Sequence, residues 1–217
     1  MICVLVQHHP SRASLLPALK KSLTPLSVEV VVDDKHPLSP WRGYQACLRQ
    51  FLQGGADFGV VLQDDVRVCI NFPLAVEQVA LANPETPICL YLGGLPKKTA
   101  SDALKAIQRG EHYVPIYFRD FVPVVGVLWP RMKAQEFLEW SKAARLPGRP
   151  PSSDDAIVGF WMRMTKQRIF ATVPSLVQHP DETSIVNPRR AKAGRDRGRT
   201  ALMFCENDPL DLDWARI

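Results

Sequence analysis

The stretch Phe58-Gly-Val-Val-Leu-Gln-Asp-Asp-Val66 decides the fold that this sequence predicts. It begins as a continuous apolar run rich in β-branched residues, which is typical of a strand buried on both faces of a parallel sheet. The run ends at Asp64 and Asp65, whose like charges repel each other unless a cation or a hydrogen-bond donor compensates them. The pair therefore indicates either a divalent metal site at the end of the strand or an ordinary turn after it.

Two earlier apolar runs also end in polar residues. Residues 2–6 are followed by Gln7, and residues 28–32 are followed by Asp33 and Asp34, a pair that is also a common turn signal. In a parallel sheet the carboxyl ends of the strands lie at one edge, and ligands bind there. These side chains are therefore expected close to the aspartate pair of the first stretch.

Segments with helical periodicity separate these strands. Residues 14–23 carry leucines at helical spacing, and residues 41–52 carry apolar side chains at positions i, i+3, i+4 and i+7. A strand, helix, strand, helix, strand order predicts an α/β fold with a mixed, mainly parallel sheet flanked by helices. Further along the chain, the same patterns predict helices over 72–81, 102–109 and 131–144, and strands over 88–92, 116–129 (one or two strands) and 168–173.

The composition indicates one globular domain over residues 1–217. The chain is 46% hydrophobic and 23% charged, which excludes wholesale disorder. No apolar run is long enough to be a transmembrane segment, and the apolar residues 1–6 have no basic region or cleavage site, so a cytoplasmic protein is expected. The five cysteines are widely spaced and without metal-binding motifs, which indicates buried thiols.

Two later motifs supply further candidate groups. Asp154 and Asp155 precede an apolar helical run, where they are either a helix cap or a catalytic carboxylate pair. His179 follows the strand over 168–173 by a few residues and is either a surface loop residue or a metal ligand. A metal that holds a diphosphate uses carboxylate oxygens and often an imidazole, and a base for a hydroxyl group needs a separate carboxylate.

In this order the motifs resemble the GT-A fold of nucleotide-sugar glycosyltransferases, in particular the family 2 and family 25 types. The resemblance covers about residues 1–180, with the metal motif at Gln63-Asp64-Asp65. That motif departs from the usual DxD or EDD pattern, because Gln63 stands in place of the first acid. The resemblance divides the chain into a nucleotide-sugar-binding half over residues 1–95, an acceptor-side half over 96–186, and a basic segment and tail over 187–217.

The resemblance also implies roles for particular residues and molecules. It implies a metal-dependent, inverting enzyme that uses Mn²⁺ or Mg²⁺ and a nucleotide-sugar donor, with a UDP-sugar favoured. The acceptor would be a hydroxyl group of a glycan or of a modified base in DNA. The implied metal ligands are Asp65 and His179, the donor-binding residues are Gln7, Asp33, Asp34 and Asp64, and the catalytic base is Asp155 or Asp154.

The net charge of +5 comes from a single segment. Residues 187–200 contain six arginines and lysines and one aspartate, so the remainder of the chain is formally neutral. The segment is a solvated arm, a loop that offsets the charge of a donor diphosphate, or a contact for nucleic acid. The last alternative predicts a different function, in which the protein binds nucleic acid through this segment or cleaves it with a metal held by the acidic strand ends.

Overall fold

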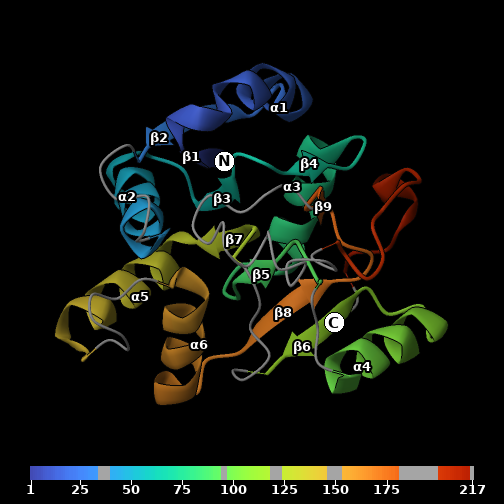
Figure 1. Ribbon diagram of the computed structural model, residues 1–217. Coiled ribbons are helices and arrows are strands. Elements are labelled where there is room, and N and C mark those ends of the chain that lie inside the picture. Colours follow the sequence, from blue (N-terminus) through green and yellow to red (C-terminus); the bar gives the residue numbers. More distant parts are fainter. Residues whose placement is uncertain (34–39, 94–96, 118–123, 146–152, 181–199, 216–217) are drawn as a thin grey trace, which may run out of the picture.

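The chain is built around a seven-stranded sheet (Figure 1). The computed structural model describes residues 1–33, 40–93, 97–117, 124–145, 153–180 and 200–215. The strands of the sheet are β1 (Ile2–His8), β2 (Ser27–Val32), β3 (Phe58–Gln63), β5 (Ile88–Cys89), β6 (Tyr113–Ile116), β7 (Gly126–Pro130) and β8 (Ile169–Thr172). They lie in the order β2-β1-β3-β7-β5-β8-β6.

The first three strands form a parallel group. β1 lies in the middle and pairs in parallel with both β2 and β3. The register places His8 level with Val32, and Gln7 level with Gln63. The residues that follow β2 and β3 therefore leave the sheet at the same edge as the end of β1, as the sequence predicted.

The second part of the sheet is mixed. β7 runs antiparallel between β3 and β5, and the edge strand β6 runs antiparallel to β8, whereas β5 and β8 are parallel. The prediction of a mixed, mainly parallel sheet flanked by helices is confirmed. The sequence predicted one or two strands over 116–129; β7 is one of them, and β6 begins earlier, with Pro115 at a sheet edge where a missing N–H is tolerated.

Helices cover both faces of the sheet. The helices α2, α5 and α6 pack together on one face, and α3 packs on the other face against β7 and α1. α4 lies beside the edge strand β6, as Figure 1 also shows. The helices are α1 (Leu16–Leu23), α2 (Pro40–Gln53), α3 (Phe72–Ala82), α4 (Lys97–Gln108), α5 (Arg131–Ala143) and α6 (Asp154–Thr165), with short 3-10 helices η1 (Pro10–Leu15) and η2 (Pro209–Asp211).

The predicted apolar stripe of α2 forms its buried face. Tyr44 is fully buried and accepts a hydrogen bond from the Trp129 indole N–H at 2.7 Å. The Phe51 ring lies so close to Gly59 of β3 that a Cβ there would come within 2.7 Å of the ring. At the end of α2, the guanidinium of Arg131 donates to four backbone carbonyls, those of Phe51, Leu52, Gly54 and Ala56. These contacts fix α2 to β3 and to the start of α5.

The described part of the C-terminal tail packs on the domain. Ala201 forms an antiparallel bridge with Gly93, and the Leu202 N–H donates to the Leu92 carbonyl at 2.7 Å. Trp214 is buried, and its indole N–H donates to the Pro209 carbonyl. Most of the predicted basic segment, residues 187–199, lies outside the described residues. None of the helices in the described ranges is long and apolar enough to cross a bilayer.

Candidate functional site

Two adjacent carboxylates lie where β3 ends. Asp64 and Asp65 are both buried, with 2% and 4% of their surface exposed. Because β1 is parallel to β3, the chain that follows β1 passes the same point and brings His8 and Arg12 to the pair. His179 approaches from the C-terminal part of the chain. His8, Arg12 and His179 are therefore assembled around one buried acidic pair.

Asp64 anchors the chain that leaves β1. One of its carboxylate oxygens contacts the His8 ring nitrogen Nδ1 and accepts from the His9 backbone N–H, both at 2.8 Å. Its other oxygen accepts from Arg12 at 3.1 Å. Both oxygens of Asp64 are thus engaged by protein groups, so Asp64 holds η1 against the sheet. Its predicted role in binding a donor remains a prediction.

Asp65 differs from its neighbour because one of its oxygens has no hydrogen-bond partner within the described part of the chain. Asp65 Oδ2 is 2.7 Å from Arg12 Nη1 and 3.5 Å from His179 Nε2. Asp65 Oδ1 is buried and makes no hydrogen bond with the described residues. Burial by itself would raise the pKa of Asp65, but the contact with His179 and the positive charge of Arg12 outweigh it and hold the pKa below its ordinary value. Asp65 is therefore a charged, buried carboxylate with one free acceptor oxygen.

A small two-stranded sheet brings His179 to Asp65. It consists of β4 (Arg67–Val68) and β9 (Val177–Gln178), which pair antiparallel with Arg67 level with Gln178. β4 begins two residues after Asp65, and β9 ends immediately before His179. Pairing of these strands therefore sets the two side chains next to each other, although they are more than 100 residues apart in the chain.

The fit of this cluster to a metal is partial. Across the described ranges, no group of three or more His, Cys, Asp or Glu side chains is arranged to hold a metal ion. Asp65 and His179 offer two ligands, an unpartnered carboxylate oxygen and a nearby imidazole, which suit a divalent cation such as Mn²⁺. The remaining ligands would have to come from a bound molecule, and a diphosphate supplies such oxygens.

A second group lies where β1 and β2 end. The Gln7 side-chain amide donates to the Pro40 carbonyl at 2.9 Å, which leaves its buried oxygen Oε1 without a partner among the described residues. Gly43 of α2 faces this group, and a Cβ there would come within 2.6 Å of Gln7 Nε2 and 2.9 Å of Asp33 Oδ2. The absence of a side chain at Gly43 thus lets Gln7 and Asp33 approach the helix. Asp34 lies outside the described residues.

The structure distinguishes the two aspartates at the start of α6. Asp155 is only partly buried and lies in the first turn of α6, whose N-cap is Ser153; its carboxylate accepts from the Ala156 N–H at 2.8 Å and contacts the Ser153 hydroxyl. Asp154 is buried; one oxygen accepts from the Asp155 N–H, and the other has no partner among the described residues. Burial, and secondly the charge of Asp155, raise the pKa of Asp154 to about 7.

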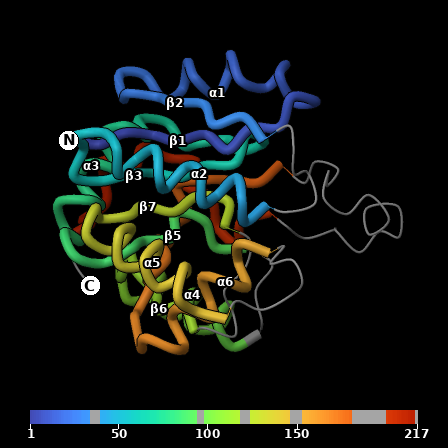
Figure 2. Tube along the Cα trace, turned by 90° about the vertical axis from the view of Figure 1, so that its left-hand side faces the viewer, coloured from blue at the N-terminus to red at the C-terminus, as the bar shows by residue number. Residues whose placement is uncertain are grey.

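Asp154 and Asp33 approach α2 from different segments of the chain. Burial is the main cause of a raised pKa of the Cys47 thiol, and the nearby charges of Asp33 and Asp154 raise it further. Figure 2 shows that α2 and α6 begin on the side of the molecule where β1 and β3 end. Asp33 and Asp154 therefore both act on Cys47 of α2, on the side of the molecule where β1 and β3 end.

Arg12 was missed in the sequence. The like charges of the aspartate pair required a compensating group, but nothing in the pattern around Arg12 identified it as that group. Its partners are 52 and 53 residues away along the chain, and only the register of β1 against β3 brings them together.

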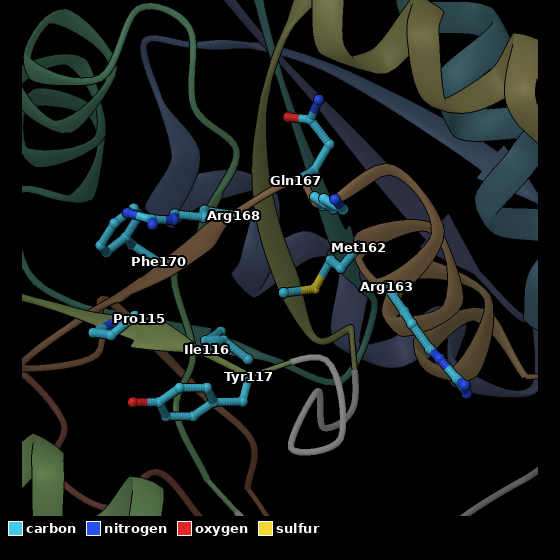
Figure 3. Close-up of a pocket in the computed structure, with 9 residues that line it drawn as sticks. Pro115, Ile116, Tyr117, Met162, Arg163, Gln167, Arg168 and Phe170 are labelled. Atoms are coloured by element: carbon cyan, nitrogen blue, oxygen red, sulfur yellow. The ribbon is translucent and has the colours of Figure 1, made fainter.

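A cavity of about 510 Å³ lies elsewhere, between the edge strand β6, the end of α6 and the start of β8 (Figure 3). β3, β5 and β8 run in the same direction, because β7 is antiparallel to both β3 and β5 and β8 is parallel to β5. The cavity lies where β8 begins and Asp65 lies where β3 ends, so the two are at opposite ends of the sheet. None of the predicted site residues lines it. Its lining consists of Pro115, Ile116, Tyr117, Met162, Arg163, Lys166, Gln167, Arg168 and Phe170.

Comparison with known proteins does not assign the chain to a family. No family model matches it, and no curated protein is similar to it in sequence. Among solved structures, A197 from STIV is 16% identical over 95% of this chain and 94% of its own, with a TM-score of 0.46. The inositol-1-phosphate CTP transferase from T. maritima is 8% identical over 79% of this chain and 65% of its own, with a TM-score of 0.37. These similarities are too low to transfer an activity.

Proposed function

We propose that this protein is a metal-dependent glycosyltransferase that transfers a sugar from a nucleotide-sugar donor to an acceptor hydroxyl. The observation that carries the proposal is the unpartnered, buried oxygen of Asp65 beside His179 at the end of β3. A charged carboxylate with a free oxygen suits a cation that also contacts a diphosphate. The carboxyl ends of strands in an open α/β sheet are the usual place for such a ligand.

The two groups of side chains would bind different parts of the donor. Asp65 and His179 would hold Mn²⁺ or Mg²⁺, which would offset the negative charge of the leaving diphosphate. Gln7 and Asp33 would bind the nucleoside, because they lie at the adjoining strand ends and their side-chain oxygens can accept hydrogen bonds from a base or a ribose. Asp34 follows Asp33 and is proposed to assist in the same pocket.

Asp154 is the better candidate for the catalytic base. A base must accept a proton from the acceptor hydroxyl as that oxygen attacks the anomeric carbon, and it works best when its pKa is near the working pH. Asp154 combines a pKa raised to about 7 with an oxygen that has no hydrogen-bond partner among the described residues. Asp155 instead lies in the first turn of α6, where the helix dipole stabilises its charge and the Ala156 N–H occupies one of its oxygens. If Asp154 directs the acceptor oxygen to the face of the sugar opposite the leaving diphosphate, the anomeric configuration is inverted.

Calorimetric titration with UDP-, GDP- and CDP-sugars, with and without Mn²⁺, tests the proposal. We expect Mn²⁺-dependent binding of at least one of them, and a UDP-sugar is the first candidate. Asp65→Asn should abolish that binding, since it removes the negative charge at the only predicted carboxylate ligand. Asp57→Asn is the matched control because Asp57 is an exposed carboxylate at the other end of β3.

The titration can also reject the proposal. If no sugar nucleotide binds with Mn²⁺, or if the Asp65→Asn protein binds as well as the natural one, the assignment of the site is wrong. Salt-sensitive DNA binding that is lost on removal of residues 187–200, together with no sugar-nucleotide binding, would support the nucleic-acid function instead. DNA binding together with sugar transfer would support an acceptor in DNA over a glycan.

A further inference from the structure

We propose that Arg12 couples the binding of the metal ion to the binding of the donor. This inference rests on the proposed function and concerns the same site. Arg12 Nη1 lies 3.1 Å from Asp64 Oδ1 and 2.7 Å from Asp65 Oδ2, so one guanidinium nitrogen bridges the two carboxylates. The protein therefore places its own positive charge beside the carboxylate that is proposed to bind a divalent cation.

The bridge between Arg12 and the two aspartates is largely removed from water, which strengthens its electrostatic effect. The side chain of Arg12 is 17% exposed, and those of Asp64 and Asp65 are 3% and 2% exposed. Charges that are largely removed from water interact more strongly than charges at a surface, because the surrounding protein screens them less. The positive charge of Arg12 therefore makes the electrostatic potential at Asp65 less negative, which opposes the binding of a second cation there.

A diphosphate changes this balance. It brings negative charges to a site that holds one guanidinium and one divalent ion, and it can be attracted to both. The metal and the nucleotide then each bind more tightly when the other is present, as thermodynamic linkage requires. Arg12 thus weakens the binding of a free metal ion in the absence of the donor.

Mn²⁺ binding without nucleotide is the direct test. The free Mn²⁺ signal in electron paramagnetic resonance gives the affinity of the natural protein and of Arg12→Met, which keeps the length of the side chain and removes its charge. We expect Arg12→Met to bind Mn²⁺ on the order of tenfold more tightly, which lies within the usual range of coupling between sites. Arg67→Met is the matched control, because Arg67 is a nearby exposed arginine whose guanidinium packs on the Phe204 ring.

A second measurement shows whether charge is the cause. Arg12→Lys retains the positive charge but loses the planar guanidinium, so it should bind free Mn²⁺ as weakly as the natural protein. Because Arg12→Met leaves two buried carboxylates without their cation, its fold should be checked by circular dichroism, and Mn²⁺ should raise its melting temperature more than that of the natural protein. Equal stabilisation by Mn²⁺ in both proteins would overturn the proposal.

The outcomes separate this proposal from the proposed function. If Arg12→Met binds free Mn²⁺ no more tightly than the natural protein, the coupling role is refuted even where sugar nucleotides bind. If Arg12→Met gains affinity for Mn²⁺ but no sugar nucleotide binds any form, the effect of Arg12 on the cation site stands and the glycosyltransferase assignment fails. With UDP present, the gain from Arg12→Met should shrink; an undiminished gain with bound UDP would also overturn the coupling.

Discussion

Replacing Asp154 by asparagine should stabilise the protein in a pH-dependent way. Burial raises the pKa of Asp154 from 3.8 to about 7, so the folded chain retains a proton that the unfolded chain has released. This carboxyl therefore favours folding at low pH, and the advantage is lost as the pH rises from about 4 towards 7. Each pH unit in this window corresponds to about 1.4 kcal/mol, which gives a loss of about 4 kcal/mol by pH 8. Asparagine has nearly the same shape and no charge to bury.

Urea denaturation at pH 5 and pH 8 measures the effect. Relative to the natural protein, Asp154→Asn should gain roughly 2 to 3 kcal/mol more free energy of unfolding at pH 8 than at pH 5, because most of the penalty arises between these values. Asp155→Asn is the comparison: it lies in the same helical turn and is partly exposed, and it should give a smaller gain, because it removes only the second cause of the raised pKa of Asp154 and leaves its burial unchanged. If Asp154 is the catalytic base, the stabilised Asp154→Asn protein should have lost sugar transfer. An equal effect of Asp154→Asn at both pH values would refute the reasoning.

Two substitutions test the packing that positions the site. Gly43→Ala should cost about 1 to 3 kcal/mol of stability in urea denaturation and weaken donor binding, because the new Cβ would lie 2.6 Å from Gln7 Nε2. Gly54→Ala is the control: its new Cβ would lie 3.5 Å from the nearest atom, so the stability should not change. Arg131→Met should lower the free energy of unfolding by about 3 kcal/mol, because the guanidinium donates to four carbonyls around the end of α2. Lys133→Met is the control: it removes only a surface ion pair and should cost less than about 1 kcal/mol in the same assay. Comparable losses for each substitution and its control would contradict the two contacts.

The ends of β1, β2 and β3 could be predicted because the change from apolar to polar residues is visible over a few neighbouring positions in the sequence. The apolar runs before Gln7, Asp33 and Asp64 each form a strand, because β-branched residues favour an extended backbone; β1 and β3 are largely buried, whereas the edge strand β2 is only partly buried. The neighbourhood of Asp65 and His179 was implied by the resemblance to glycosyltransferases, and the β4–β9 pairing brings the two together.

Other features depend on geometry that no local pattern contains. The difference between Asp154 and Asp155 arises because neighbouring residues on a helix point about 100° apart, so the orientation of α6 decides which carboxylate is buried. The bridge formed by Arg12 requires the exact register of β1 against β3 together with the path of η1. The antiparallel direction of β7 was also beyond the sequence pattern, because an apolar run has no direction.

The position of β7 has a consequence for synthesis of the chain on the ribosome. The strands β1, β2 and β3 can pair as soon as residue 63 has emerged, but β5 pairs only with β7 and β8, which are made later. Until residues 126–130 are available, β3 presents an unpaired edge with the apolar sequence FGVVLQ, and such an edge can pair with other chains. Residues 1–95 expressed alone would keep that edge unpaired. A nascent chain stalled before β7 exposes the same edge, and we expect chaperones to bind it.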